Sequence, residues 1–204
     1  MILYGATTNP GKLREFRLAA ERLGPDGITI EALPGLNRIQ APEENGATFE
    51  ANAIIKATYY SEFTGGLLFA DDSGLEVTAL AGAPGVHSAR FAGPAATDAT
   101  NNALLLDRLR GVTNRAGRFV CVIAVAQRGK LVETFRGEVQ GQIADAPRGT
   151  NGFGYDPLFF YPPFGCTFGE SDLDRKMKVS HRARAVDAML KYFSSAGTGC
   201  HSMG

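Results

Sequence analysis

The sequence has few of the residues on which disulfide and zinc chemistry depend. Its 204 residues include three cysteines and three histidines. The cysteines are odd in number, without a Cys-X-X-Cys pair, and Cys121 lies in the apolar run FVCVIAVA, where a thiol behaves as a small hydrophobic side chain. The histidines lack the paired spacing that a zinc site needs. We therefore expect neither a disulfide framework nor zinc, whereas a hard metal with oxygen ligands remains open.

The sequence also lacks an excess of charge and a long apolar run. Lys plus Arg and Asp plus Glu each number 21, so no overall field attracts nucleic acid or a membrane surface. No apolar stretch approaches the roughly 20 residues of a membrane-spanning helix. The opening stretch MILYGATTNPGK becomes polar too soon for a signal peptide. We expect a cytoplasmic protein that contacts neither nucleic acid nor membrane.

What remains is the composition of one globular α/β domain. With 44% hydrophobic residues, a chain of this length can bury a real core. We predict one domain over residues 1–196, built as two lobes whose polar loops converge on a cleft, and a loose tail over 197–204. The predicted elements are strands over 1–6 and 28–33, helices over 12–23 and from Thr48 to about Phe63, a strand ending at Asp72, a helix from Thr97 or Asp98 to Gly111, a hairpin around Arg128-Gly129-Lys130, and a helix after Ser180.

Two adjacent acids follow an apolar run in FADDSGLEV. Asp71 and Asp72 precede a Ser-Gly pair, and such residues can simply form a turn at a strand end. In open α/β sheets, however, ligands bind beyond the carboxyl ends of strands. One of these aspartates could hold Mg²⁺ together with substrate phosphates and with one glutamate of the long loop APEENGA, Glu43 or Glu44. The glutamates alone are more typical of solvated loop charges than of metal ligands.

The stretch GATTNPGKL (5–13) lies between the first strand and the first helix. Free N–H groups and the helix dipole favour an anion there, which suggests phosphate. It is not a Walker A loop, because five residues separate Gly5 from Gly11-Lys12 and Leu13 follows. The structural alternative is a capped helix start with Lys12 as a solvated charge.

Two further segments combine aromatic or basic residues with turn residues. In GFGYDP (152–157), the Phe153 ring could stack on a purine, which contributes on the order of 1–3 kcal/mol per base. Asp156 could accept from a base or a ribose, whereas Tyr155 fits a core anchor better. In DRKMKVSHRARA (174–185), Ser180 is placed to cap the last helix. Basic residues are unfavourable in a first helical turn, so a bound anion or polar ligand would explain His181 and Arg182. Lys178 and Arg184 fit a solvated face.

These motifs, in this order, resemble the inosine triphosphate pyrophosphatase family, enzymes that hydrolyse non-standard purine nucleoside triphosphates. The likeness runs from TTNPGK through FADDSGL, GAPGVHSARFAG and GFGYDP to SHRARA. Each motif alone is weak evidence, but five in register are highly specific. Thr8 is the departure in the first motif, where small residues such as Gly or Ser are usual.

The resemblance implies an elongated mixed β-sheet with flanking helices, forming two lobes around a central nucleotide-binding cleft. It implies a homodimer that needs Mg²⁺ and cleaves ITP, dITP or XTP to the monophosphate and pyrophosphate, as house-cleaning of the nucleotide pool. Asp72 would activate water and bind the metal with Glu43, and Lys12 would assist catalysis. The residues implied to bind substrate are Thr7, Thr8, Asn9, Pro10, Gly11, Lys12 and Ser73 for the triphosphate, Phe153, Gly154, Tyr155 and Asp156 for the nucleoside, and Lys176, His181 and Arg182 for the 6-oxo purine edge.

Rival functions fit parts of the same sequence. A pyrophosphatase for a modified pyrimidine or a methylated guanine triphosphate would use a similar architecture. A nucleotide sensor or nucleic-acid-binding module would use the same loops without turnover, although the neutral charge disfavours extended nucleic-acid contacts. A phosphotransferase is disfavoured by the failed Walker A match. No residue identifies how GTP would be rejected.

Overall fold

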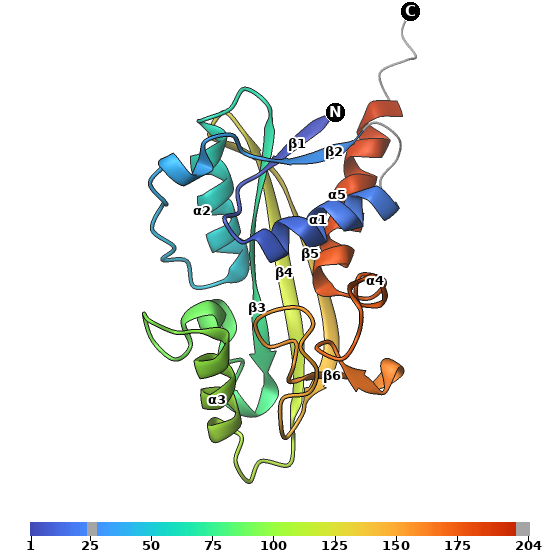
Figure 1. Cartoon of the computed structure of the whole chain (residues 1–204). Helices are drawn as coiled ribbons and strands as arrows, with labels where there is room; N and C mark the ends of the chain where they lie inside the picture. The colour runs from blue at the N-terminus through green and yellow to red at the C-terminus, as the bar shows by residue number, and fades with distance from the viewer. Residues whose placement is uncertain (24–27, 199–204) are drawn as a thin grey trace, which may run out of the picture. The chain divides into compact units, whose positions relative to one another are not determined.

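The computed structural model describes residues 1–23 and 28–198 (Figure 1). Its strands are β1 (Ile2–Gly5), β2 (Thr29–Ala32), β3 (Leu67–Val77), β4 (Ala116–Gln127), β5 (Lys130–Ile143), β6 (Phe159–Tyr161) and β7 (Cys166–Thr167). Within the described residues they form one seven-stranded sheet in the order β2-β1-β3-β4-β5-β6-β7. β1 pairs in parallel with β2 and β3, whereas β6 pairs antiparallel with β5 and β7. The predicted mixed sheet is therefore confirmed.

The main helices begin where the sequence places capping residues. Thr48 Oγ1 accepts from the backbone N–H of Ala51 at 3.1 Å, and Thr97 forms a capping box with Thr100. Pro10 opens the first helix, a position where its missing N–H costs nothing. The helices are α1 (Pro10–Leu23), α2 (Phe49–Ser61), α3 (Asp98–Arg108), α4 (Leu173–Lys176) and α5 (His181–Thr198). The short α4 was not predicted.

The expectation that a strand ends at the aspartate pair is wrong. β3 continues through Asp71 and Asp72 to Val77. Asp, Ser and Gly are depleted in strands, but tertiary contacts override that preference here. A Cβ on Gly74 would overlap Ser88 Oγ and lie 2.7 Å from the carbonyl oxygen of Gly85. Gly74 therefore permits close backbone packing inside a strand instead of forming a turn.

The predicted hairpin joins β4 to β5. Arg128 and Gly129 both have positive φ, 51° and 75°. A two-residue hairpin loop with a type I′ turn requires positive φ at both of its residues. Lys130 is the first residue of β5 and not part of the turn. At the other end of the chain, α5 extends into the predicted tail as far as Thr198. The rest of that tail lies outside the described residues.

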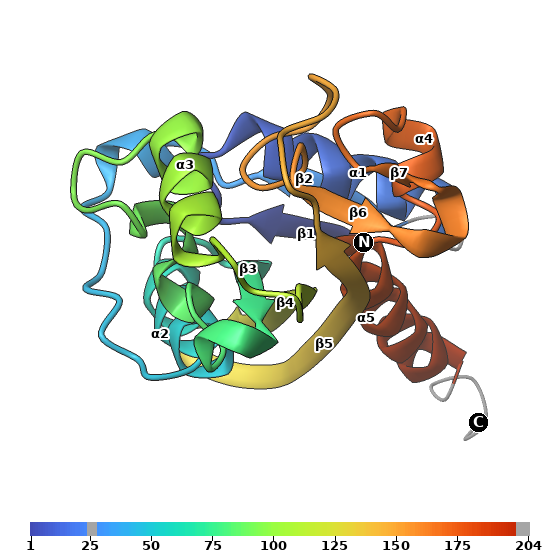
Figure 2. The same ribbon diagram turned by 90° about the horizontal axis from the view of Figure 1, so that it is seen from below.

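The described residues divide into two compact units. The first contains Met1–Asp72, Cys121–Gly137 and the described residues from His181 on, and the second contains Ser73–Val120 and Glu138–Ser180. In the first unit, α1 packs against α5, and the ring of Phe16 meets that of Phe69 edge-on at 5.0 Å. In the second unit, β7 pairs with β6 and the chain then turns into α4 (Figure 2). Each unit has buried apolar residues of its own.

Among residues 1–23 and 28–198, no helix has the length and hydrophobicity that crossing a membrane requires.

Candidate active site

Asp71 and Asp72 face opposite sides of β3. Successive side chains of a strand alternate between its two faces. Phe69 and Asp71 share the face that meets α1, since Phe16 contacts the ring and Lys12 contacts the carboxylate. Asp72 faces α2, which in Figure 1 lies on the other side of β3 and β4 from α5. The adjacent acids therefore belong to two different clusters of the first unit.

Asp71 is held as a buried anion. Its Oδ2 lies 2.9 Å from Lys12 Nζ, and its side chain is only 2% exposed. Burial raises the pKa of Asp71, but the charges of Lys12, Arg182 and Lys56 outweigh burial and lower the pKa to about 2. Lys12 is thus a partly buried, ion-paired cation. The alternative of a solvated lysine at this helix start is wrong.

The loop before α1 is shaped by its own polar side chains. Thr7 Oγ1 accepts from the N–H of Asn9 at 3.2 Å, and Asn9 Oδ1 accepts from the N–H of Lys12 at 3.0 Å. Asn9 therefore caps α1, as the sequence suggested for Thr and Asn. Thr8 and Pro10 are exposed to solvent. The loop presents an accessible surface beside a fixed lysine.

Asp72 lies at the centre of a cluster that links α2 to the acidic loop. Its Oδ1 accepts from Lys56 Nζ at 3.2 Å, and the same Nζ donates to Glu44 Oε2 at 2.8 Å. Its Oδ2 accepts from Asn52 Nδ2 at 3.2 Å. No motif in the sequence points to Asn52 or Lys56. Their spacing of four residues puts both on one face of α2, and this was the available signal.

Burial and neighbouring charges shift the pKa values of Asp72 and Lys56, and each of these two groups affects the other. Burial raises the pKa of Asp72 and the charge of Asp71 adds to that rise, while Lys56 and Lys12 oppose it without cancelling it. For Lys56, burial lowers the pKa, but Asp72, Asp71 and Glu44 outweigh burial and raise it. Lys56 is therefore cationic at neutral pH. Asp72 is a stronger proton acceptor than an ordinary aspartate, as a general base requires.

The acidic loop offers two candidates for a second metal ligand. Glu43 is exposed, whereas Glu44 is the loop acid joined through Lys56 to Asp72. In the described parts of the chain, no three His, Cys, Asp or Glu side chains cluster closely enough to hold a metal alone. Mg²⁺ commonly takes one or two carboxylates and completes its shell with water and substrate phosphates. Two carboxylates with a cation held between them fit that pattern.

The basic cluster before and within α5 divides into buried and exposed members. Arg182 is buried in the first turn of α5 and forms an ion pair with Glu15 of α1. This carboxylate raises the pKa of Arg182 against the opposing effect of burial. Glu15, to which no sequence motif points, is therefore the anion paired with Arg182, whereas the ligand expected for His181 stays a prediction. His181 is also buried.

Lys178, in the turn between α4 and α5, and Arg184, in α5, are exposed, as expected for solvated side chains. In the sequence, Lys178 precedes and Arg184 follows the buried His181 and Arg182. The prediction for these two side chains is confirmed.

In the second unit, the structure brings Phe153, Asp156 and Lys176 together. Asp156 Oδ2 accepts from Lys176 Nζ at 2.6 Å and from the N–H of Phe153 at 3.0 Å. Lys176 Nζ lies 5.3 Å from the centre of the Phe153 ring. A Cβ on Gly152 would overlap Asp156 Oδ2. Through these two hydrogen bonds, the buried Asp156 fixes the ammonium of Lys176 and the backbone of Phe153.

Helix α3 and Ser88 hold the next two residues of this segment. The N–H of Gly154 donates to Asp98 Oδ2 at 2.6 Å, and Asn102 Nδ2 donates to the carbonyl of Gly154 at 3.0 Å. Tyr155 is buried and its hydroxyl donates to the carbonyl of Ser88 at 2.8 Å. Tyr155 is therefore a core anchor, which is the interpretation preferred from sequence. Ser73 is half-buried in β3.

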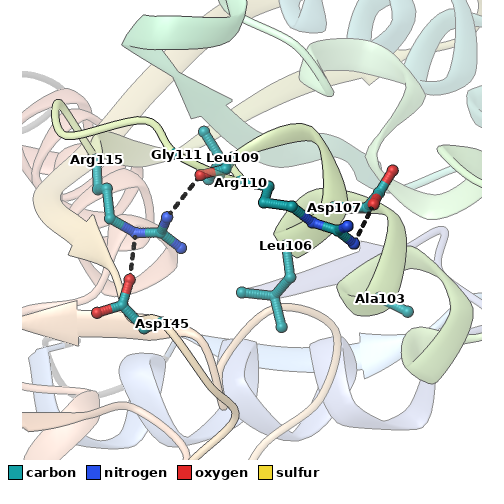
Figure 3. Close-up of a pocket in the computed structure, with 8 residues that line it drawn as sticks. All are labelled: Ala103, Leu106, Asp107, Leu109, Arg110, Gly111, Arg115 and Asp145. Carbon is teal, nitrogen blue, oxygen red and sulfur yellow. Dashed lines mark hydrogen bonds and ion pairs between the residues drawn. The ribbon is translucent and has the colours of Figure 1, made fainter.

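A pocket at the C-terminal end of α3 contains none of the predicted site residues (Figure 3). Its charged side chains neutralise one another, since Arg110 pairs with Asp107 at 2.7 Å and Arg115 with Asp145 at 3.2 Å. Arg115 also donates to the carbonyl of Leu109 at 3.0 Å. This pocket has no free charge that would select a ligand, and we assign it no function.

The fold and these clusters define a mixed α/β protein with buried carboxylate–cation pairs. The model of the Ham1 family matches residues 3–192, and the chain belongs to that family. A dITP/XTP pyrophosphatase of Acidobacterium capsulatum is 51% identical over 93% of this chain and 97% of its own length. One of Thermus thermophilus is 47% identical over 92% and 89%. The Staphylococcus aureus Ham1 protein is 35% identical, with a TM-score of 0.84 over 96% of this chain and 100% of that one.

Proposed function

We propose that the chain is a pyrophosphatase that hydrolyses ITP, dITP and XTP to the nucleoside monophosphate and pyrophosphate. The observation that carries the proposal is Asp72, a buried carboxylate held between Asn52 and Lys56. A buried base beside fixed cations suits attack of water on a phosphoanhydride. The relatives named as dITP/XTP pyrophosphatases at 47–51% identity support the substrate class.

The reaction requires a base and cations around a phosphorus atom that is surrounded by negative oxygens. Asp72 accepts a proton from water as the water oxygen bonds to phosphorus. The P–O bond of the α–β anhydride then breaks, and pyrophosphate leaves. Lys12 and the N–H groups at the start of α1 bind phosphate oxygens, and Lys56 stabilises negative charge near the base.

Mg²⁺ is part of the proposal, with Asp72 and Glu44 as its protein ligands. Glu44 replaces Glu43 in this role because its carboxylate is the one linked to Asp72 through Lys56. The ion would neutralise phosphate oxygens and polarise the reacting phosphoryl group. Lys56 holds the two carboxylates of the free protein near a shared positive charge, and this arrangement supports a cation site.

Base recognition is proposed for Phe153 and Lys176 of the second unit, and the role of His181 at the 6-oxo edge stays a prediction. The Phe153 ring offers a stacking surface, and Lys176 is a donor fixed by Asp156. Donors aimed at the 6-oxo group lose their partner and meet an amine when adenine replaces hypoxanthine. Arg182 is proposed to contribute indirectly, because it is buried and its Nη1 is paired with Glu15. We further propose that the protein is cytoplasmic and forms a homodimer. Light scattering would measure the mass of the assembly and so test the homodimer.

The identity of the products tests the proposal most simply. Purified protein is incubated with ITP and Mg²⁺, and the products are separated by anion-exchange chromatography. We expect IMP and pyrophosphate in equal amounts. Release of IDP and orthophosphate would place the cleaved bond elsewhere and overturn the proposal.

A further inference from the structure

Asn52 joins the acidic loop to the proposed catalytic base. Asn52 is a buried residue, 1% exposed, in the early part of α2. Its Oδ1 accepts from the N–H of Gly46 at 2.8 Å, and its Nδ2 donates to Asp72 Oδ2 at 3.2 Å. One amide thus contacts both the backbone of the loop and the carboxylate on β3.

These contacts close a ring of hydrogen bonds within the first unit. From Asp72 the ring passes through Lys56 to Glu44, with distances of 3.2 and 2.8 Å. The chain then runs from Glu44 to Gly46, and Asn52 returns the ring to Asp72. Breaking the ring at Asn52 releases both the loop and one oxygen of the carboxylate.

Gly46 shows that the loop fits closely onto the amide. A Cβ at this position would lie 2.7 Å from Asn52 Oδ1 and 2.8 Å from the Cβ of Ala51. A buried amide costs free energy unless both of its ends are hydrogen-bonded. An apolar side chain would avoid that cost, so the amide at position 52 calls for a reason other than packing.

We propose that Asn52 is a positioning residue, which sets the orientation of the Asp72 carboxylate and its distance from Glu44. The significance for turnover rests on the proposed function, whereas the hydrogen bonds themselves do not. Groups that orient metal-binding carboxylates typically contribute about 10–100-fold to metal affinity or activity. The structure assigns that task to Asn52.

The test compares Asn52→Ala with Asn101→Ala. Asn101 is a matched control, because it is also buried and its amide is also hydrogen-bonded at both ends, accepting from the N–H of Ala92 at 2.8 Å and donating to the carbonyl of Ala89 at 3.1 Å. The probe is Mn²⁺, whose dissociation constant is read from the free-ion EPR signal. We expect the constant to rise about 10–100-fold in Asn52→Ala and to stay at the wild-type value in Asn101→Ala. In turnover, Asn52→Ala should lower kcat at fixed metal with little change in KM for ITP.

Amide hydrogen exchange gives a readout that needs no metal. The N–H of Gly46 should lose protection in Asn52→Ala and keep it in Asn101→Ala. A Mn²⁺ dissociation constant that is unchanged in Asn52→Ala, or raised equally in both variants, would overturn the assignment.

If Asn52→Ala does not fold, Gly46→Ala strains the same contact from the loop side and should weaken Mn²⁺ binding. Wild-type Mn²⁺ affinity in Gly46→Ala would contradict the proposal. A wild-type protein that releases no pyrophosphate would refute the proposed function, while Mn²⁺ binding and exchange still decide the role of Asn52.

Discussion

At the scale of single residues, two neighbouring aspartates have opposite properties because their side chains face different clusters. Asp71 faces Lys12 and has a depressed pKa, so it stays ionised and fixes the lysine. Asp72 faces Asn52 and Lys56 and has a raised pKa, as suits a group that accepts a proton. Adjacency in the sequence therefore does not imply a shared task.

Replacing Asp72 by Asn should abolish most turnover and leave nucleotide binding. The amide keeps the shape of the side chain but cannot accept a proton from water, a loss of about 10²–10⁴-fold in rate. Pyrophosphate release measures the rate, and calorimetric titration with ITP measures binding. Glu76→Gln changes another carboxylate of β3, one that pairs with Arg118 in the second unit, and controls for charge. Full activity in Asp72→Asn would remove Asp72 from the mechanism.

Asp71 should make stability depend on pH in the acid range. Its pKa is about 2 in the folded protein and 3.8 as a reference value, so its contribution is present above about pH 4 and is lost as pH falls towards 2. Asp71→Asn should lower the free energy of unfolding by about 2 kcal/mol at neutral pH, with the difference from wild type shrinking in acid. Urea denaturation at pH 7, 5, 4 and 3 measures this. A difference independent of pH would contradict the ion pair with Lys12.

The sequence revealed the residues that resemble known motifs but not most of their partners. Lys12 and Asp72 stand in recognisable segments. Asn52, Lys56 and Glu15 do not, and their contacts join residues 20, 16 and 167 positions apart. Only the fold brings such residues together. Helical spacing on α2 could have paired Asn52 with Lys56, yet it could not have identified Asp72 as their common partner.

At the scale of elements, local capping signals predicted helices well, whereas turn-forming residues misled the prediction for β3. Thr48 and Thr97 have side chains that satisfy free N–H groups within a few residues, so their effect is visible in sequence. Gly74 favours a turn by intrinsic preference, but its lack of a side chain instead admits the chain around Ser88. Propensity is a weak guide where a strand packs against a distant segment.

Gly74→Ala should destabilise the protein strongly, because a Cβ on this residue of β3 would meet Ser88 Oγ and the carbonyl of Gly85 from a later segment of the chain. Overpacking of this kind typically costs about 1–3 kcal/mol. Gly65→Ala is the control, since no atom lies within 4 Å of a Cβ built there. Thermal unfolding of both variants measures the difference. Equal melting temperatures would contradict the close packing of β3 against Ser88.

At the scale of the whole molecule, each unit contains its own set of proposed functional residues. The first holds Lys12, Lys56 and Asp72, whose charges suit phosphate and metal chemistry, and the second holds Phe153 and Lys176, which suit a base. The division between the units in β3 falls directly after Asp72. The α/β class was predicted from the order of expected strands and helices, and the family from the order of the motifs. The sequence did not predict that β3, β4 and β5 each run from one unit into the other. The hydrophobic pattern gives no sign of where a long strand changes neighbours.

The central claim is metal-dependent hydrolysis of non-standard purine nucleotides, and pyrophosphate release tests it directly. The protein is assayed with ITP, XTP, dITP, GTP and ATP, each in Mg²⁺ and in EDTA. We expect release that strongly favours the first three substrates and disappears in EDTA. Equal release from all five, or no release by folded protein that still binds nucleotide, would contradict it.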